Sequence, residues 1–203
     1  MIIVNQECDF IVKNLKAVEA LKESCSQAEK RVPDWLRSEV FRELGRRINE
    51  MPFHGEIEWE YEENEDEVTL TPKQYYDGKH EMGLFYGIEY FNWDSLTAEN
   101  REDGLWAYLY YNLPDKTPKN MKQKIQKWED RLRAVTEKRK SELLERYHVF
   151  PDEDDKNYLV KYYLNNTLNA ESLGVDPKEA IKEAVGCLIQ LVEDTKEMII
   201  PHP

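Results

Sequence analysis

The chain has 203 residues, of which 40% are apolar and 11% aromatic, so it can bury a core and is not an intrinsically disordered segment. No apolar run approaches the roughly 20 residues that a membrane span needs, and no signal peptide is recognisable, so we expect a cytoplasmic protein. The net charge of −13 is divided unevenly: residues 48–71 contain nine acids and no Lys or Arg, whereas residues 116–146 contain eleven basic residues against five acids.

Two helices are predicted at the start of the chain. Apolar residues recur at helical spacing over 9–31, and Pro33, a favoured first-turn residue, opens a second stripe. Because the connection between them is short, we expect an antiparallel helical hairpin over 1–51. Cys25 and Cys187 both lie on apolar stripes, where a free thiol behaves as a small buried hydrophobe.

Residues 56–70 then change from helical spacing to strict alternation, which predicts two strands joined by a turn. The residues on one face are apolar or aromatic: Ile57, Trp59, Tyr61, Val68 and Leu70. Pairing Tyr61 with Val68 keeps these side chains on one face, and it sets Glu62 opposite Glu67.

The other face of this hairpin and its turn carry eight carboxylates: Glu56, Glu58, Glu60, Glu62, Glu63, Glu65, Asp66 and Glu67. Alternate strand residues recur at roughly 6.7 Å, so Glu56, Glu58, Glu60 and Glu62 form a line of like charges about 20 Å long that resembles a nucleic-acid backbone. Two structural explanations stand beside a functional one. The charges can protect an edge strand from pairing with another chain, or the basic segment 116–146 can neutralise them. Since mixed signs serve solubility without repulsion, the absence of Lys and Arg favours a binding surface.

The remaining elements complete a mainly antiparallel sheet of about five strands. Strands at 84–91 and 105–111 are apolar on both faces, which is typical of the centre of a sheet. A long basic helix follows, and Asp176 begins a C-terminal core helix. Hairpin strands in series with helices at the ends predict one α+β domain over 1–203. Its predicted parts are the helical hairpin, the sheet, the long helix, and a strand plus the last helix: 1–51, 55–112, 117–148 and 157–199.

The long basic helix has two interpretations. Its Lys and Arg side chains could bind nucleic-acid phosphates, but they surround the helix, and acids such as Glu129 and Glu137 are interleaved with them. The net charge of −13 also opposes approach to a nucleic acid. We therefore expect a solvated amphipathic helix, or a homodimer seam through Trp128, and no direct nucleic-acid binding.

Catalytic signatures are missing from the sequence. There is no nucleophile elbow, no glycine-rich phosphate loop and no paired metal-ligand motif, so we expect no cofactor and no resident metal. One enzyme alternative remains: Asp77, Lys79 and Glu89 have the residue types that a metal-dependent hydrolase or nuclease uses. Another alternative is a ligand-sensing domain whose aromatic central strands line a pocket.

These observations lead to one leading hypothesis. The chain is a non-enzymatic interaction protein that docks its acidic hairpin on a basic surface of a partner, such as a protein that otherwise binds nucleic acid. It would act as an inhibitor, an immunity factor or an adaptor.

Overall fold

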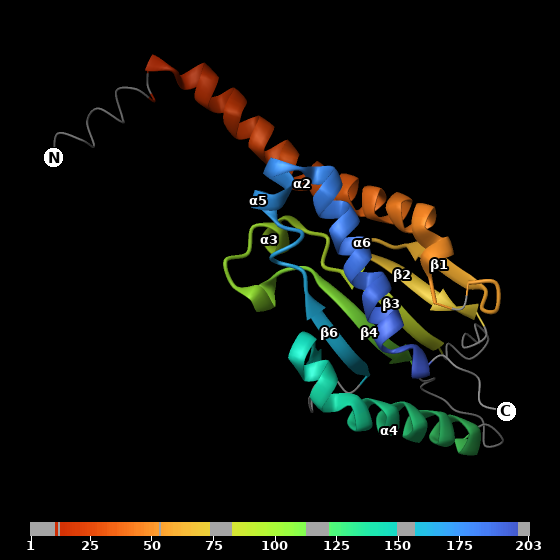
Figure 1. Cartoon of the computed structure of the whole chain (residues 1–203). Helices are drawn as coiled ribbons and strands as arrows, with labels where there is room; N and C mark the ends of the chain where they lie inside the picture. Colours follow the sequence, from red (N-terminus) through yellow and green to blue (C-terminus); the bar gives the residue numbers. More distant parts are fainter. Residues whose placement is uncertain are drawn as a thin grey trace.

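The computed structural model describes residue 11 and residues 13–52, 54–73, 83–112, 122–149 and 157–198. These residues form an α+β fold in which helices flank one antiparallel sheet (Figure 1). The helices are α2 (Leu15–Arg47), α3 (Trp93–Leu96), α4 (Lys122–Arg146), α5 (Ala170–Val175) and α6 (Pro177–Asp194). Short 3-10 turns lie at η1 (Ile48–Glu50), η3 (Arg101–Asp103) and η4 (Lys196–Met198).

The sheet has six antiparallel strands in the order β1-β2-β3-β4-β6-β5. Their bounds are β1 (Trp59–Glu63), β2 (Glu67–Pro72), β3 (Gly83–Glu89), β4 (Trp106–Asn112), β5 (His148–Val149) and β6 (Tyr158–Tyr163). The predicted α+β class is therefore confirmed, and so is the central place of the two strands that are apolar on both faces. The sequence pattern missed β5 because two residues are too few to show a period.

The predicted N-terminal helical hairpin is wrong. The chain forms one continuous helix, α2, and Pro33 lies inside it. Proline removes one backbone hydrogen bond and usually ends a helix. Here no Gly or Asn lies near Pro33 to begin a turn, and the second half of α2 is held by Leu36, Val40 and Leu44 in the core. Cys25, expected to be buried, is exposed as a result.

The core lies between the sheet and the helices α2 and α6, which pack on the same face of the sheet (Figure 1). Helix α6 begins as predicted: the Asp176 side chain accepts hydrogen bonds from the backbone N–H groups of Lys178 and Glu179, and Pro177 takes the first turn. The Tyr86 hydroxyl on β3 lies 2.9 Å from the hydroxyl oxygen of Thr195 after α6, so the one polar group of this buried ring is paired.

Helix α4 packs beside β6 and β5, at the opposite end of the sheet from β1 (Figure 1). The residue after it is fixed to the end of α6, because Tyr147 donates a 2.6 Å hydrogen bond to Asp194. Burial alone would raise the pKa of Asp194, but the hydrogen bonds from Tyr147, Gln190 and Arg146 outweigh it and hold that pKa below its usual value. None of the helices in the described part of the chain has both the length and the hydropathy of a membrane span.

Candidate functional site

The acidic hairpin, defined as residues 56–67, occupies one edge of the sheet. Strand β1 is the edge strand, and its alternation places the Tyr61 ring against Phe41 of α2, with centroids 5.1 Å apart, while Glu60 and Glu62 project from the other face. The structure begins this strand at Trp59, so Glu56 and Glu58 precede it. The fold thus anchors the hairpin through its aromatic face and leaves Glu60 and Glu62 outward.

The register of the hairpin differs from the expected one. Glu63 pairs with Val68, and Tyr61 pairs with Leu70, which is a shift of two residues. A two-residue shift keeps every side chain on its predicted face but removes the expected repulsion, because Glu62 now lies opposite Thr69. The turn is closed by the hydrogen bond from the Asn64 N–H to the Glu67 carbonyl, at 2.9 Å.

Three of the eight carboxylates are neutralised or capped by neighbours. Glu63 lies 3.1 Å from Arg37 Nε and accepts a 2.7 Å hydrogen bond from Ser38. Glu58 accepts a 2.6 Å bond from Lys73, the residue that follows the cation-free stretch of the sequence. That bond, with Glu60 also nearby, raises the pKa of Lys73 above its usual value. Glu67 accepts from Tyr108.

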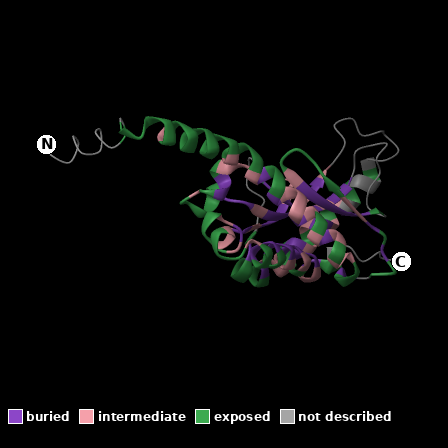
Figure 2. Ribbon diagram, turned by 90° about the horizontal axis from the view of Figure 1, so that it is seen from above, coloured by how far each residue is buried: buried purple, intermediate pink, exposed green. Residues whose placement is uncertain are grey.

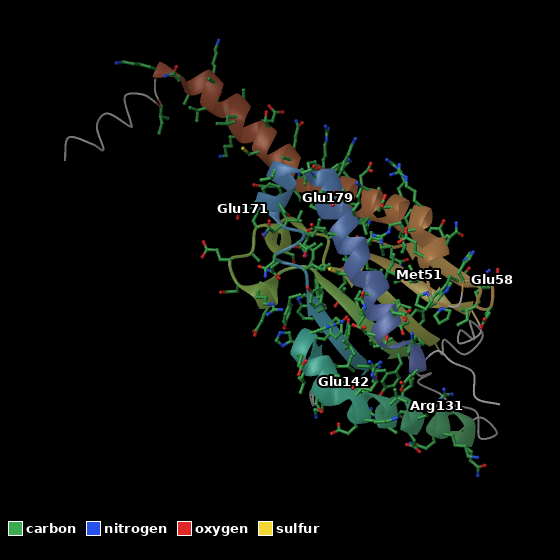
Figure 3. All side chains as sticks on the ribbon, in the orientation of Figure 1. Met51, Glu58, Arg131, Glu142, Glu171 and Glu179 are labelled. Carbon is green, nitrogen blue, oxygen red and sulfur yellow. The ribbon has the colours of Figure 1, made fainter. Side chains whose placement is uncertain are left out.

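The other five carboxylates form no ion pair with a residue that the structure describes: Glu56, Glu60, Glu62, Glu65 and Asp66. All are exposed except Glu60, which is half-buried. Figure 3 shows Glu58 beside this cluster, on the hairpin side of the molecule. The predicted binding surface is therefore brought together in part: five free carboxylates in the hairpin and three whose charge is already partnered.

The basic helix does not lie over the hairpin in the described part of the chain. It stands at the other end of the sheet, and Figure 3 places Arg131 and Glu142 there. Several of its cations have partners away from the hairpin: Arg133 pairs with Glu129 at 3.0 Å, and Arg146 pairs with Asp194 of α6 at 3.0 Å. The side chain of Trp128, the expected dimer seam, lies outside the described side chains, so that prediction stays a prediction.

A polar cluster that the sequence pattern did not reveal lies on the sheet face opposite the helices. Glu67 of β2 lies directly opposite Glu89 of β3, and each carboxylate accepts a tyrosine hydroxyl. Tyr108 donates to Glu67 at 2.7 Å, and Tyr158 donates to Glu89 at 2.9 Å. Gly87 makes the first bond possible: a Cβ there would come within 2.6 Å of the Tyr108 hydroxyl that crosses above it.

Lys161 completes this cluster. Its side chain is only 3% exposed, and its Nζ lies 3.6 Å from the Trp106 ring centroid and 3.9 Å from that of Tyr158. A buried ammonium over two aromatic faces is stabilised by their quadrupoles. Glu89 had been singled out because it interrupts an apolar strand, but its hydroxyl partner comes from β6, about 70 residues further along, where no local pattern points back to it.

Of the three residues proposed for the hydrolase alternative, the structure describes only Glu89. Asp77 and Lys79 lie outside the described residues, and Glu89 is occupied by Tyr158. No group of three or more His, Cys, Asp or Glu side chains among the described residues is placed to hold a metal ion. Comparison with known proteins gives no lead either, since no family model, no curated protein and no solved structure matches this chain. The function must be argued from the geometry.

Proposed function

We propose that this chain is an interaction protein that docks its acidic hairpin on a basic surface of a partner protein. The observation that carries the proposal is the set of five hairpin carboxylates that form no ion pair with a described residue, at the edge of the sheet furthest from the basic helix. A partner that otherwise binds nucleic acid fits best, because its surface is already shaped for a row of negative charges. The protein would act as an inhibitor, an immunity factor or an adaptor, and we place it in the cytoplasm.

The free energy of docking comes from charges that repel one another in the free protein. Like charges that alternate along one strand repel one another in the free protein, and a basic partner removes that repulsion while gaining Coulomb attraction. Such attraction mainly raises the association rate and is screened by salt. Edge protection of β1 is the competing explanation, and it requires no partner at all.

The test is capture of cellular proteins on immobilised protein at low and high salt, with binding constants then measured on the purified partner. The test variant carries Glu56→Lys, Glu60→Lys and Glu62→Lys. The matched control carries Glu145→Lys, Glu171→Lys and Glu183→Lys, three exposed acids of α4, α5 and α6 that make the same change in net charge. We expect the hairpin variant to lose at least about tenfold in affinity and the control to keep binding, with wild-type affinity falling steeply as salt rises.

Two outcomes reject the proposal. One is a partner that binds both variants and wild type equally at every salt concentration. The other is a folded wild-type protein that captures nothing basic in low salt, in which case edge protection explains the carboxylates.

A second candidate function, ligand sensing, is favoured by one observation. The sheet face opposite the helices carries a row of aromatic rings, in which the half-buried Trp106 packs between the exposed Tyr90 at 5.2 Å and the buried Tyr163 at 5.4 Å, centroid to centroid. Rings of this kind can stack on a planar ligand. A small molecule that raises the melting temperature of wild type but not of Trp106→Leu would support this function, and a compound screen without any such molecule would count against it.

A further inference from the structure

The first half of α2 projects from the body of the protein as an isolated helix, here called the arm and defined as residues 15–32 (Figures 1 and 2). Every buried residue of α2 lies beyond it: Pro33, Leu36, Val40 and Leu44. In Figure 2 the arm is almost wholly exposed, in contrast to the body. Most of the stability of a helix in a protein comes from the packing of its apolar face, so an uncovered helix is only marginally stable in water.

The arm carries an apolar stripe that continues onto Trp35 and is largely uncovered in the described chain, although Val32 at its body end packs in part against the core. Its members follow alternate steps of three and four residues: Val18, Leu21, Cys25, Ala28, Val32 and Trp35. This is the heptad spacing of a two-helix seam. Leu21 is 65% exposed and Trp35 is 45% exposed, which are high values for such large apolar groups. The stripe ends on Trp35, whereas its neighbour Leu36 points into the core with no exposed surface.

We infer that the arm pairs with the arm of a second copy of this chain, in antiparallel orientation. The stripe is self-complementary when two copies run in opposite directions about a centre between Ser26 and Gln27. The layers are then Val18 with Trp35, Leu21 with Val32, and Cys25 with Ala28, each pair formed between the two copies. The smaller side chains meet at the centre, where the helices approach most closely, and the seam spans about 26 Å.

The flanking charges select this arrangement. Lys22 and Glu29 border the stripe on the same side, and the antiparallel register brings Lys22 of each copy against Glu29 of the other. A shift of one heptad would instead oppose the two Lys22 side chains. Parallel pairing would place Lys22 beside Ala17 and Glu29 beside Ser24, which satisfies neither charge. Charge complementarity therefore points to a second copy and fixes its direction.

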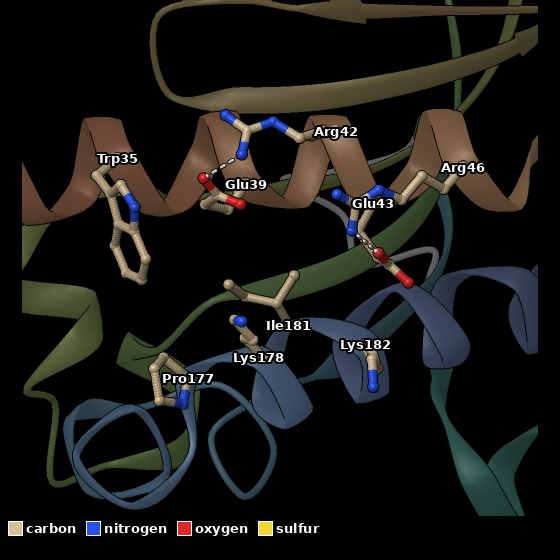
Figure 4. A pocket seen from close by; sticks show the side chains of 9 residues that line it. All are labelled: Trp35, Glu39, Arg42, Glu43, Arg46, Pro177, Lys178, Ile181 and Lys182. Atoms are coloured by element: carbon tan, nitrogen blue, oxygen red, sulfur yellow. Dashed lines mark hydrogen bonds and ion pairs between the residues drawn. The ribbon is translucent and has the colours of Figure 1, made fainter.

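A groove on the body extends the same surface. Beyond Trp35, the space between α2 and α6 forms a cavity of about 480 Å³ (Figure 4). Trp35 and Ile181 point into it from opposite helices, and its α2 rim is occupied by the paired charges Arg42–Glu39 at 2.6 Å and Arg46–Glu43 at 3.2 Å. In the proposed register Leu15 of the second copy lies at the level of Ser38 along α2, next to Trp35 at the start of this groove.

Disulfide trapping tests the pairing and its direction together. In a background with Cys8, Cys25 and Cys187 changed to Ser, we expect Leu21→Cys with Val32→Cys to oxidise to a covalent dimer. Either substitution alone gives none, because two copies of residue 21 lie about 16 Å apart along the seam and a disulfide needs Cα atoms within about 7 Å. In a parallel dimer the single variant Leu21→Cys would cross-link to itself.

Sedimentation equilibrium tests the dimer without cross-links. Wild type is expected to be dimeric at micromolar concentration, Leu21→Glu monomeric, and the matched control Leu144→Glu dimeric, since Leu144 is a 54% exposed leucine of α4. Lys22→Glu weakens the dimer by about tenfold, and Lys22→Glu with Glu29→Lys restores it. A monomeric wild type at 100 µM, or cross-linking of the single cysteine variants, overturns the inference.

Discussion

At the residue scale, Arg37 joins helix α2 to the acidic hairpin. Its side chain is 14% exposed and contacts three groups: the Glu63 carboxylate at 3.1 Å, the Asp34 carboxylate at 3.2 Å and the backbone carbonyl of Glu65. Hydrogen bonds to charged groups are about twice as strong as neutral ones. One arginine thereby fixes the hairpin turn and cancels one of its charges, which leaves the remaining carboxylates held in place.

Substitution of Arg37 tests this role. We expect Arg37→Ala to lower the free energy of unfolding by about 1.5 kcal/mol, because a largely buried, charge-assisted contact is lost and Glu63 is left without its cation. Urea denaturation measures the change. The control is Lys140→Ala, which removes a solvent-exposed ion pair with Glu137 at 3.5 Å and should cost less than about 0.5 kcal/mol. Equal losses in the two variants would contradict the role given to Arg37.

At the element scale, α2 is one helix with two environments. Its second half buries Leu36, Val40 and Leu44 against the sheet, whereas its first half has no fully buried residue in the described chain and touches the core only through the partly buried Val32 at its end. Pro33 stands at the junction, where its missing N–H weakens the helix. The stability of the body should therefore depend on one half of the helix, while association between copies depends on the other.

Two leucine substitutions in this helix separate those effects. Leu44→Ala is expected to cost about 3 kcal/mol in the free energy of unfolding, because Leu44 has no exposed surface and its loss leaves a cavity. Leu21→Ala should change it by less than about 0.5 kcal/mol at concentrations where the protein is monomeric. Denaturation at low protein concentration gives both values. A large loss for Leu21→Ala under those conditions would mean that the arm packs on its own body.

At the scale of the whole molecule, charge is distributed in two poles across the sheet. The acidic hairpin lies at the β1 edge and the basic helix α4 beside β6 and β5. Between the two poles, on the sheet face opposite the helices, Glu67 accepts a hydrogen bond from Tyr108 and Glu89 accepts one from Tyr158. Burial is the main cause that raises the pKa of several tyrosines above the usual value, and the Glu67 carboxylate adds to it for Tyr108. In the folded protein these tyrosine side chains are therefore protonated, neutral phenols.

Alkaline pH should therefore unfold the protein. A tyrosine whose pKa is raised on folding contributes stability that is complete below its unfolded pKa of about 10 and is lost as the pH rises above that value. We expect a flat free energy of unfolding between about pH 8 and 9, followed by a steep fall above about pH 10. Tyr108→Phe should make that fall shallower by up to about 1.4 kcal/mol per pH unit. Identical slopes in wild type and Tyr108→Phe would refute this assignment.

The sequence by itself determined the features that depend on neighbouring residues. Alternation separated the aromatic from the acidic face of β1, two-sided apolar runs marked β3 and β4 as central, and Asp176 with Pro177 marked the start of α6. These patterns reflect backbone geometry, since each residue's face follows from its place in a 2.0 or 3.6 residue period. One local rule failed, at Pro33, because the packing of the residues after it outweighs the cost of proline inside a helix.

Only the tertiary structure decided which carboxylates are free. Arg37 neutralises Glu63 from 26 residues away, and Tyr108 reaches Glu67 across an intervening strand. A shift of the hairpin by two residues preserves every face and is therefore invisible to a periodic pattern, yet it changes which charges meet. Likewise, an apolar helical stripe reads the same whether it is buried, as near Leu44, or exposed, as at Cys25. Long-range contacts set these outcomes, and no local period encodes them.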